Sequence, residues 1–188
     1  MNNLQGSYQN SAGGGDVEQM SADFHRLGQT IGSNVQKILQ NVSSMQRMIA
    51  NIGTPQDNQQ LQTQLHQIQH YTGQLAKDTS KHLKQLNEYG DQANISSSVS
   101  ASEQRQWRLQ RERLCNDFTK ALNSFQAAQR SAAQKEKEVV KKARHSGAGT
   151  LPGPTSGGNP LIDMDEGNQN TTAAVMSQQV KGFVYRIC

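Results

Sequence analysis

The stretch MSADFHRLGQTIGSNVQKILQNVSSMQRMIANI, residues 20–52, decides the fold. Its apolar residues follow one another at spacings of four and three, a heptad pattern that places an apolar seam along one side of an α-helix. They are Met20, Phe24, Leu27, Ile31, Val35, Ile38, Val42, Met45, Ile49 and Ile52. We therefore expect a helix over about residues 16–52. It should end at Gly53, which can take the left-handed cap, and Pro55 can open the next helix.

Two further periodic stretches follow the first. The second, about residues 55–89, has a seam that two threonines should weaken; it comprises Leu61, Leu65, Ile68, Thr72, Leu75, Thr79, Leu83 and Leu86. The third, about residues 101–144, begins at a capping-box pattern, Ser100 to Glu103. Its seam comprises Leu114, Phe118, Ala121, Leu122, Phe125, Ala128 and Ala132.

Three long helices joined by short connections predict an all-α fold, an antiparallel up-down-up three-helix bundle. We expect almost no strand, because the sequence shows no β-branched alternation and no hairpin turn signal. The bundle should occupy residues 16–145. Low-complexity composition predicts a disordered amino-terminal segment, 1–15, and a disordered linker and tail, 146–188.

Composition limits the classes of function. The 188 residues are only 33% hydrophobic, which does not suit a large enzyme core, and no apolar run is long enough to span a bilayer. The two cysteines, Cys115 and Cys188, lie far apart in the sequence and predict no disulfide framework, which favours a reducing, cytosolic setting. Cys115, beside the seam residue Leu114, should pack as a small apolar side chain.

No catalytic, cofactor-binding or metal-binding residue is predicted. His66 and His70 stand four apart, a spacing that can serve one zinc ion, but the Glu base of a metalloprotease and a third ligand are missing. A solvated helix face explains the pair better. Glycines inside the predicted helices, Gly28, Gly32 and Gly73, either are outweighed by seam packing or mark a close helix approach.

The third stretch carries the whole of the net charge of +4, with about six positive charges in excess between residues 101 and 145. One basic group surrounds Trp107: Arg105, Arg108, Arg111 and Arg113. Another lies at the carboxyl-terminal end of the helix: Lys135, Lys137, Lys141, Lys142 and Arg144. Such a face could bind phosphates of nucleic acid or of anionic lipid. Interleaved acids and the helix dipole favour an ordinary solvated face instead, and no nucleic-acid partner is expected.

Several blocks of the sequence resemble the amino-terminal domain of endosomal syntaxins of the syntaxin-seven type, which are target-membrane SNAREs. The resemblance covers about residues 20–145 and agrees with the three helices expected above. The blocks, in order, are Gly53–Asp57, Tyr71–Thr79, Ser102–Arg105, Arg111–Leu114, Asp117–Phe118, Phe125–Gln126, Gln129–Arg130 and Lys135–Glu138.

The resemblance implies a three-helix Habc domain, a regulatory part of proteins that act in vesicle docking and fusion among endosomes and lysosomes. It implies SNARE proteins and SNARE-regulating proteins of the Sec1/Munc18 type as partners, bound in grooves beside the seams, and no cofactor. We expect a monomer located in the cytoplasm, at endomembrane surfaces through its partners.

The family's SNARE helix and membrane anchor would follow the linker, and the chain departs from the pattern there. Residues 159–166 still resemble a family linker, but Met176, Val180, Phe183 and Ile187 keep a heptad spacing over too short a stretch for a coiled coil. We therefore expect a form without a fusion helix or anchor. Two alternatives stay open: a homo-oligomeric coiled-coil scaffold, and an anionic-lipid binder that uses the basic third helix.

Overall fold

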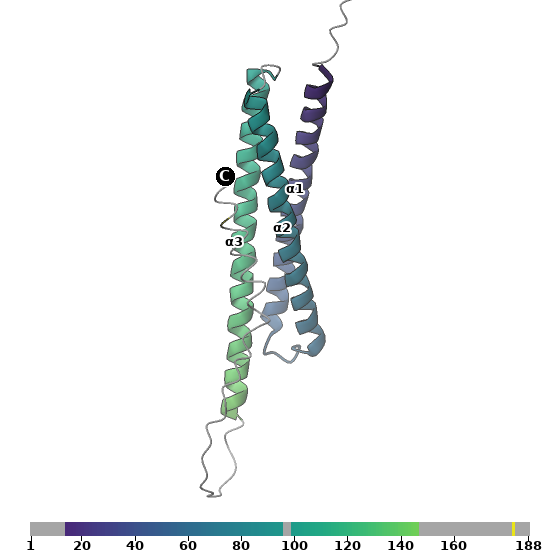
Figure 1. The fold of residues 1–188 in the computed structure, drawn as a ribbon. Coiled ribbons are helices and arrows are strands. Elements are labelled where there is room, and N and C mark those ends of the chain that lie inside the picture. The colour runs from purple at the N-terminus through teal and green to yellow at the C-terminus, as the bar shows by residue number, and fades with distance from the viewer. Residues whose placement is uncertain (1–13, 96–98, 147–181, 183–188) are drawn as a thin grey trace, which may run out of the picture.

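Three long α-helices make up the fold: α1 (Gly14–Asn51), α2 (Gln59–Ile95) and α3 (Ala101–Ser146) (Figure 1). The structure is a computed structural model, and it describes residues 14–95, 99–146 and 182. Each helix runs antiparallel to the one before it in the chain, so that in Figure 1 α1 runs down, α2 up and α3 down, and the described residues contain no strand. The all-α three-helix bundle is thereby confirmed. The predicted domain limits stay predictions, because the segments 1–13 and 147–181 lie outside the described residues.

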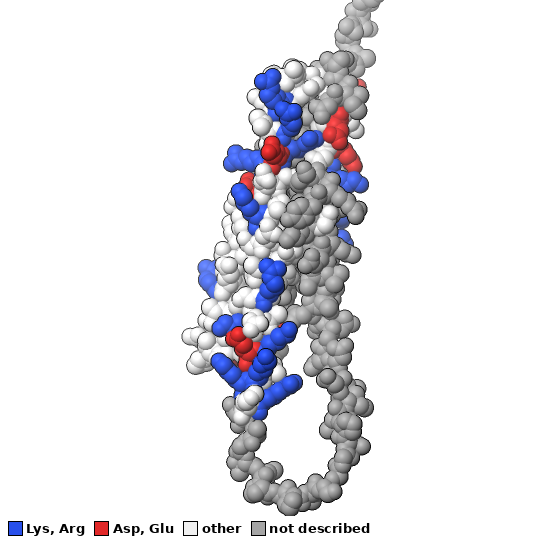
Figure 2. All heavy atoms as spheres, turned by 90° about the vertical axis from the view of Figure 1, so that its left-hand side faces the viewer, with Lys and Arg blue, Asp and Glu red and all other residues white. Residues whose placement is uncertain are grey.

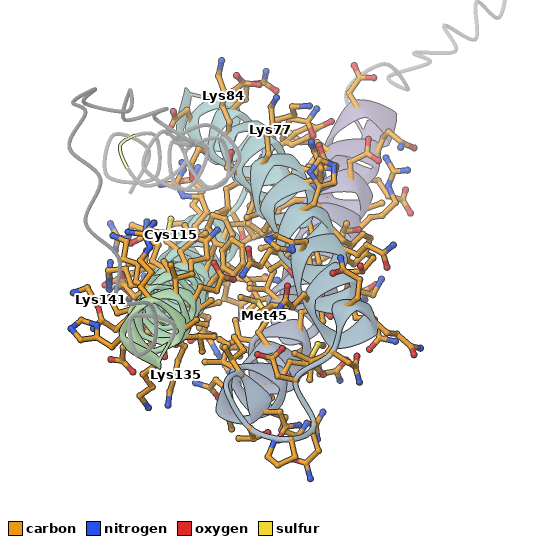
Figure 3. The ribbon with its side chains drawn as sticks, turned by 90° about the horizontal axis from the view of Figure 1, so that it is seen from below. Met45, Lys77, Lys84, Cys115, Lys135 and Lys141 are labelled. Atoms are coloured by element: carbon orange, nitrogen blue, oxygen red, sulfur yellow. The ribbon has the colours of Figure 1, made fainter. Side chains whose placement is uncertain are left out.

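The heptad seam of α1 lies in the core, as predicted. Eight of its ten residues are buried, and Met20 and Leu27 are partly buried against them. Phe24, Ile31, Ile38 and Met45 are fully shielded from solvent. Seen along the bundle from below, Met45 lies between the three helices (Figure 3). Because α1 contacts α2 and α3 more extensively than these two contact each other, its seam forms the centre of the core.

The connection between α1 and α2 is longer than the sequence pattern predicts. Gly53 takes the left-handed conformation expected of it, with φ of 76°, and its N–H donates to Oδ2 of Asp57 at 2.8 Å. Pro55 does not open α2, so that expectation is wrong. The helix begins at Gln59 because Oδ1 of Asn58 accepts a hydrogen bond from the N–H of Leu61 at 2.8 Å, an N-cap that Pro55 cannot provide.

The two threonines in the seam of α2 are fully buried and hydrogen-bonded. The hydroxyl of Thr72 donates to the carbonyl of Ile68, and that of Thr79 to the carbonyl of Leu75, both at 2.6 Å. Asn41 of α1 donates through Nδ2 to Oγ1 of Thr72 at 3.0 Å. These polar side chains therefore fill the seam without leaving an unpaired hydroxyl, and one of them joins α2 to α1.

The second helix ends at Ile95 rather than near Tyr89, because α3 supports its last turns. The guanidinium of Arg111 donates to the carbonyl of Asn87 and to Oδ1 of Asp91, each at 3.3 Å. It lies over Gly90, where any β-carbon would collide with it. Glycine at this position thus lets the two helices approach around one arginine side chain.

The third helix begins where the capping-box pattern places it. The Oγ of Ser100 accepts a hydrogen bond from the N–H of Glu103 at 3.2 Å. The carboxylate of Glu103 does not complete the box in the usual way; it accepts a hydrogen bond from the hydroxyl of Ser21 of α1, also at 3.2 Å. The start of α3 is thereby tied to the start of α1.

The predicted seam of α3 is buried except for Leu114, which is partly buried. Cys115 is buried beside it, as expected of a small apolar side chain. Cys188 lies outside the described residues.

Candidate binding surfaces of the third helix

The basic group predicted around Trp107 is not a single surface. Trp107 is only 2% exposed, and its ring stacks on that of Phe24 with centroids 4.3 Å apart and an interplanar angle of 9°. Arg111 is 21% exposed at its side chain and is bound to α2. Trp107 therefore belongs to the core and not to the basic face, because its apolar ring packs between α1 and α3. Arg105, Arg108 and Arg113 remain exposed.

A groove of about 610 Å³ lies between α1 and α3. Leu109, which is 58% exposed, and the partly buried Leu114 give it apolar walls. The residues that line it are Gly32, Val35, Gln36, Leu109, Gln110, Arg113, Leu114 and Asp117. Only apolar and hydrogen-bonding side chains and one ion pair meet there, so the groove suits binding rather than catalysis.

Glycines of α1 shape the wall of this groove. A β-carbon at Gly28 would stand 2.7 Å from Nε2 of Gln110, which supports a close approach of α1 and α3 at that residue. At Gly32 the nearest atom would be Cδ2 of Leu114 at 4.0 Å, which leaves the groove open. Nothing lies within 4 Å of a β-carbon at Gly73, so that glycine marks no approach.

The charges on α3 frame the apolar part of the groove. Arg105 and Arg113 stand four residues before and after Leu109, which places all three on one line along the helix. The side chain of Arg113 is 84% exposed, and its ion pair with Asp117 spans 3.9 Å between Nε and Oδ2. Exposed pairs of this kind contribute little stability, so Arg113 is available to another carboxylate.

The predicted histidine pair lies on the outer face of α2. His66 and His70 are both exposed, and Nδ1 of His66 lies 2.9 Å from the carbonyl oxygen of Gln62 in its own helix. Across residues 14–95, 99–146 and 182, no group of three or more His, Cys, Asp or Glu side chains is placed to hold a metal ion.

The basic group at the end of α3 is exposed. Lys and Arg side chains gather over the lower part of α3 in Figure 2, and Lys135 and Lys141 point away from the bundle in Figure 3. The end of the helix reaches past the connection between α1 and α2 (Figure 1). None of the described helices combines the length and the apolar character that crossing a membrane requires.

Comparisons with known proteins agree with this architecture. A family model described as syntaxin-like protein matches residues 27–180. Syntaxin-7 of Homo sapiens is 41% identical over 152 residues, which is 80% of this chain and 55% of that protein. Syntaxin-7 of Rattus norvegicus is 43% identical over 149 residues, 79% of this chain and 52% of that protein.

A more distant relative belongs to a plant. Syntaxin-22 of Arabidopsis thaliana is 34% identical over 108 residues, which is 57% of this chain and 37% of that protein. The chain thus spans about half the length of the syntaxin-7 proteins that it matches.

Proposed function

Because the chain belongs to the syntaxin-like family, we propose that it acts in vesicle docking and fusion among endosomes and lysosomes. Its role there is that of an amino-terminal regulatory domain. It binds SNARE proteins and SNARE-regulating proteins of the Sec1/Munc18 type, and these partners bring it to endomembrane surfaces. The syntaxin-like match over residues 27–180 includes most of the three-helix bundle, which supports this role.

The groove between α1 and α3 is the observation that carries the proposal. A helical partner buries an apolar side chain in such a groove and turns its polar side chains toward the rims. Leu109 offers more than half of its surface to an apolar side chain, and Arg105 and Arg113 offer charge at both sides. The partner helix that fits carries a large apolar residue with carboxylates one turn before and after it.

A titration with helices of endosomal SNAREs tests the proposal. The Leu109→Asp variant should lose affinity at least about tenfold, because it places a carboxylate at the apolar wall of the groove. Tyr71→Asp is the matched control, since Tyr71 is 55% exposed on α2, outside the groove. Its affinity should equal that of the unmodified chain.

Two results would contradict the proposal. One is the absence of measurable binding to any endosomal SNARE helix and to any Sec1/Munc18-type protein. The other is equal binding by the Leu109→Asp variant and the unmodified chain, which would show that the partner does not bind in the groove.

A further inference from the structure

A row of five exposed side chains runs along the last turns of α3 at spacings of four, three, four and three. We call it the cationic row: Arg130, Gln134, Lys137, Lys141 and Arg144. The heptad spacing puts all five on one face of the helix, and four of them are cations while none is an acid. At 1.5 Å per residue the row is about 21 Å long.

The cationic row faces away from the bundle. Ala132 is 2% exposed, and Val139 packs against the core, with Cγ2 close to Gly53 of the α1–α2 connection. A step of two residues along an α-helix turns a side chain by about 160° around the helix axis. The members of the row that lie two residues before or after Ala132 or Val139 therefore point to the opposite side of the helix. Lys141, two residues after Val139, accordingly points outward in Figure 3.

None of the ion pairs between described residues involves any of the row's four cations. Glu138, beside the row, accepts a hydrogen bond from Nε2 of Gln134 at 3.0 Å. On α2, by contrast, Lys81 pairs with Asp78 at 3.3 Å and Lys84 with Glu88 at 4.0 Å. The four cations of the row therefore keep their charge available for an external anion.

The helix dipole does not explain the whole row. Its effect on side-chain charge falls off within the last turn of a helix. Lys137 lies more than two turns before the end of α3 at Ser146, and Arg130 more than four. Half of the row's cations therefore stand where the dipole offers them no stabilisation.

We propose that the cationic row is a docking site for an anionic membrane surface, which it binds through lipid phosphate headgroups. A protein interface needs apolar or aromatic anchors among its charges, and the row contains none. Stacking on nucleic-acid bases needs exposed aromatic rings, whereas Trp107 is in the core. Four long cationic side chains on one outward face suit headgroups that lie in a plane and rearrange laterally. This goes beyond the proposed function, which places the chain at membranes only through its partners.

Flotation of the full chain with lipid vesicles tests the inference. The probes are vesicles of phosphatidylcholine alone and vesicles with about 30% phosphatidylserine, at about 0.1 M salt. The chain should float with the anionic vesicles only, and less as the salt rises. Each Lys near an anionic leaflet strengthens binding about fivefold, so the double variant Lys137→Gln and Lys141→Gln should bind about 25-fold more weakly.

The matched control removes two positive charges from α2. The double variant Lys81→Gln and Lys84→Gln has the same net charge but keeps the row, and it should bind almost as the unmodified chain does. Lys137→Arg with Lys141→Arg should also keep binding. Circular dichroism of every variant checks that the helices remain folded.

Three results would overturn the inference: equal flotation with neutral and anionic vesicles, equal loss in the α2 control, or tighter binding of the row to a duplex oligonucleotide than to the vesicles. The vesicles contain no protein. A failure here therefore leaves SNARE binding by the groove untouched, and a failure of SNARE binding leaves this result untouched.

Discussion

The stack of Trp107 on Phe24 joins the amino-terminal parts of α1 and α3 through two side chains. Both rings are almost wholly buried, and their near-parallel planes at 4.3 Å give an aromatic contact in addition to the area they remove from water. Beside them the hydroxyl of Ser21 donates to Glu103. These contacts fix the register of α3 against α1, and that register sets the walls of the groove.

Truncation of the stack should be among the most damaging single changes. Trp107→Ala leaves a large cavity, and we expect it to lower the free energy of unfolding by about 3–5 kcal/mol. Leu109→Ala, two residues away on the exposed face, should change it by less than about 0.5 kcal/mol. Urea unfolding followed by circular dichroism measures both. A loss below about 1 kcal/mol for Trp107→Ala would contradict a structural role for the ring.

The role of Trp107 could not be predicted from the sequence. Gln106 and Arg108 flank it in the chain and indicate a surface, whereas its partner Phe24 lies on another helix. The seam residues were predictable because burial on a helix repeats with the heptad spacing. For Trp107, one contact between helices outweighed the local composition.

At the scale of the elements, helix ends depend on side-chain caps more than on the seams. Ser100 caps α3 where the sequence pattern placed it, and Gly53 ends α1 with the expected positive φ. The start of α2 was mispredicted because Pro55 is favourable in the first turn of a helix, whereas Asn58 is favourable as an N-cap. The hydrogen bond from the N–H of Leu61 to Oδ1 of Asn58 makes Asn58 the N-cap. The groove was not predictable either, since its walls combine side chains of α1 and α3 that lie far apart in the sequence.

The N-cap of α2 should be measurable by substitution. Asn58→Ala removes the acceptor for the N–H of Leu61, and we expect it to lower the free energy of unfolding by about 1 kcal/mol. Gln60→Ala, an exposed change in the first turn, should stay within about 0.5 kcal/mol. Thermal and urea unfolding compare the two variants. If Asn58→Ala proved as stable as the control, α2 would not depend on this cap.

At the scale of the whole molecule, one chain buries its own seams. The apolar residues of all three helices meet in a single core, with Ile31, Ile38 and Leu86 fully enclosed. A coiled-coil scaffold instead needs a seam left open for a second chain. The large apolar residues still exposed within the described residues are Leu39, Tyr71, Leu109 and Val140, and they form no heptad seam. A monomer therefore fits the bundle better than the homo-oligomeric scaffold does.

Sedimentation equilibrium tests the monomer directly. The apparent mass should stay at the 20.7 kDa of one chain over a wide range of concentrations. A mass that rises steadily with concentration would favour the homo-oligomeric coiled coil and would contradict a self-contained bundle.

Binding of a helix in the groove between α1 and α3 is tested most directly by amide chemical shifts of the labelled chain during titration with an endosomal SNARE helix. The largest changes should occur at Gly32, Leu109 and Arg113, which line the groove. The amides around Tyr71 on α2 should hardly change. No change at the groove, or changes confined to α2, would contradict the proposed site.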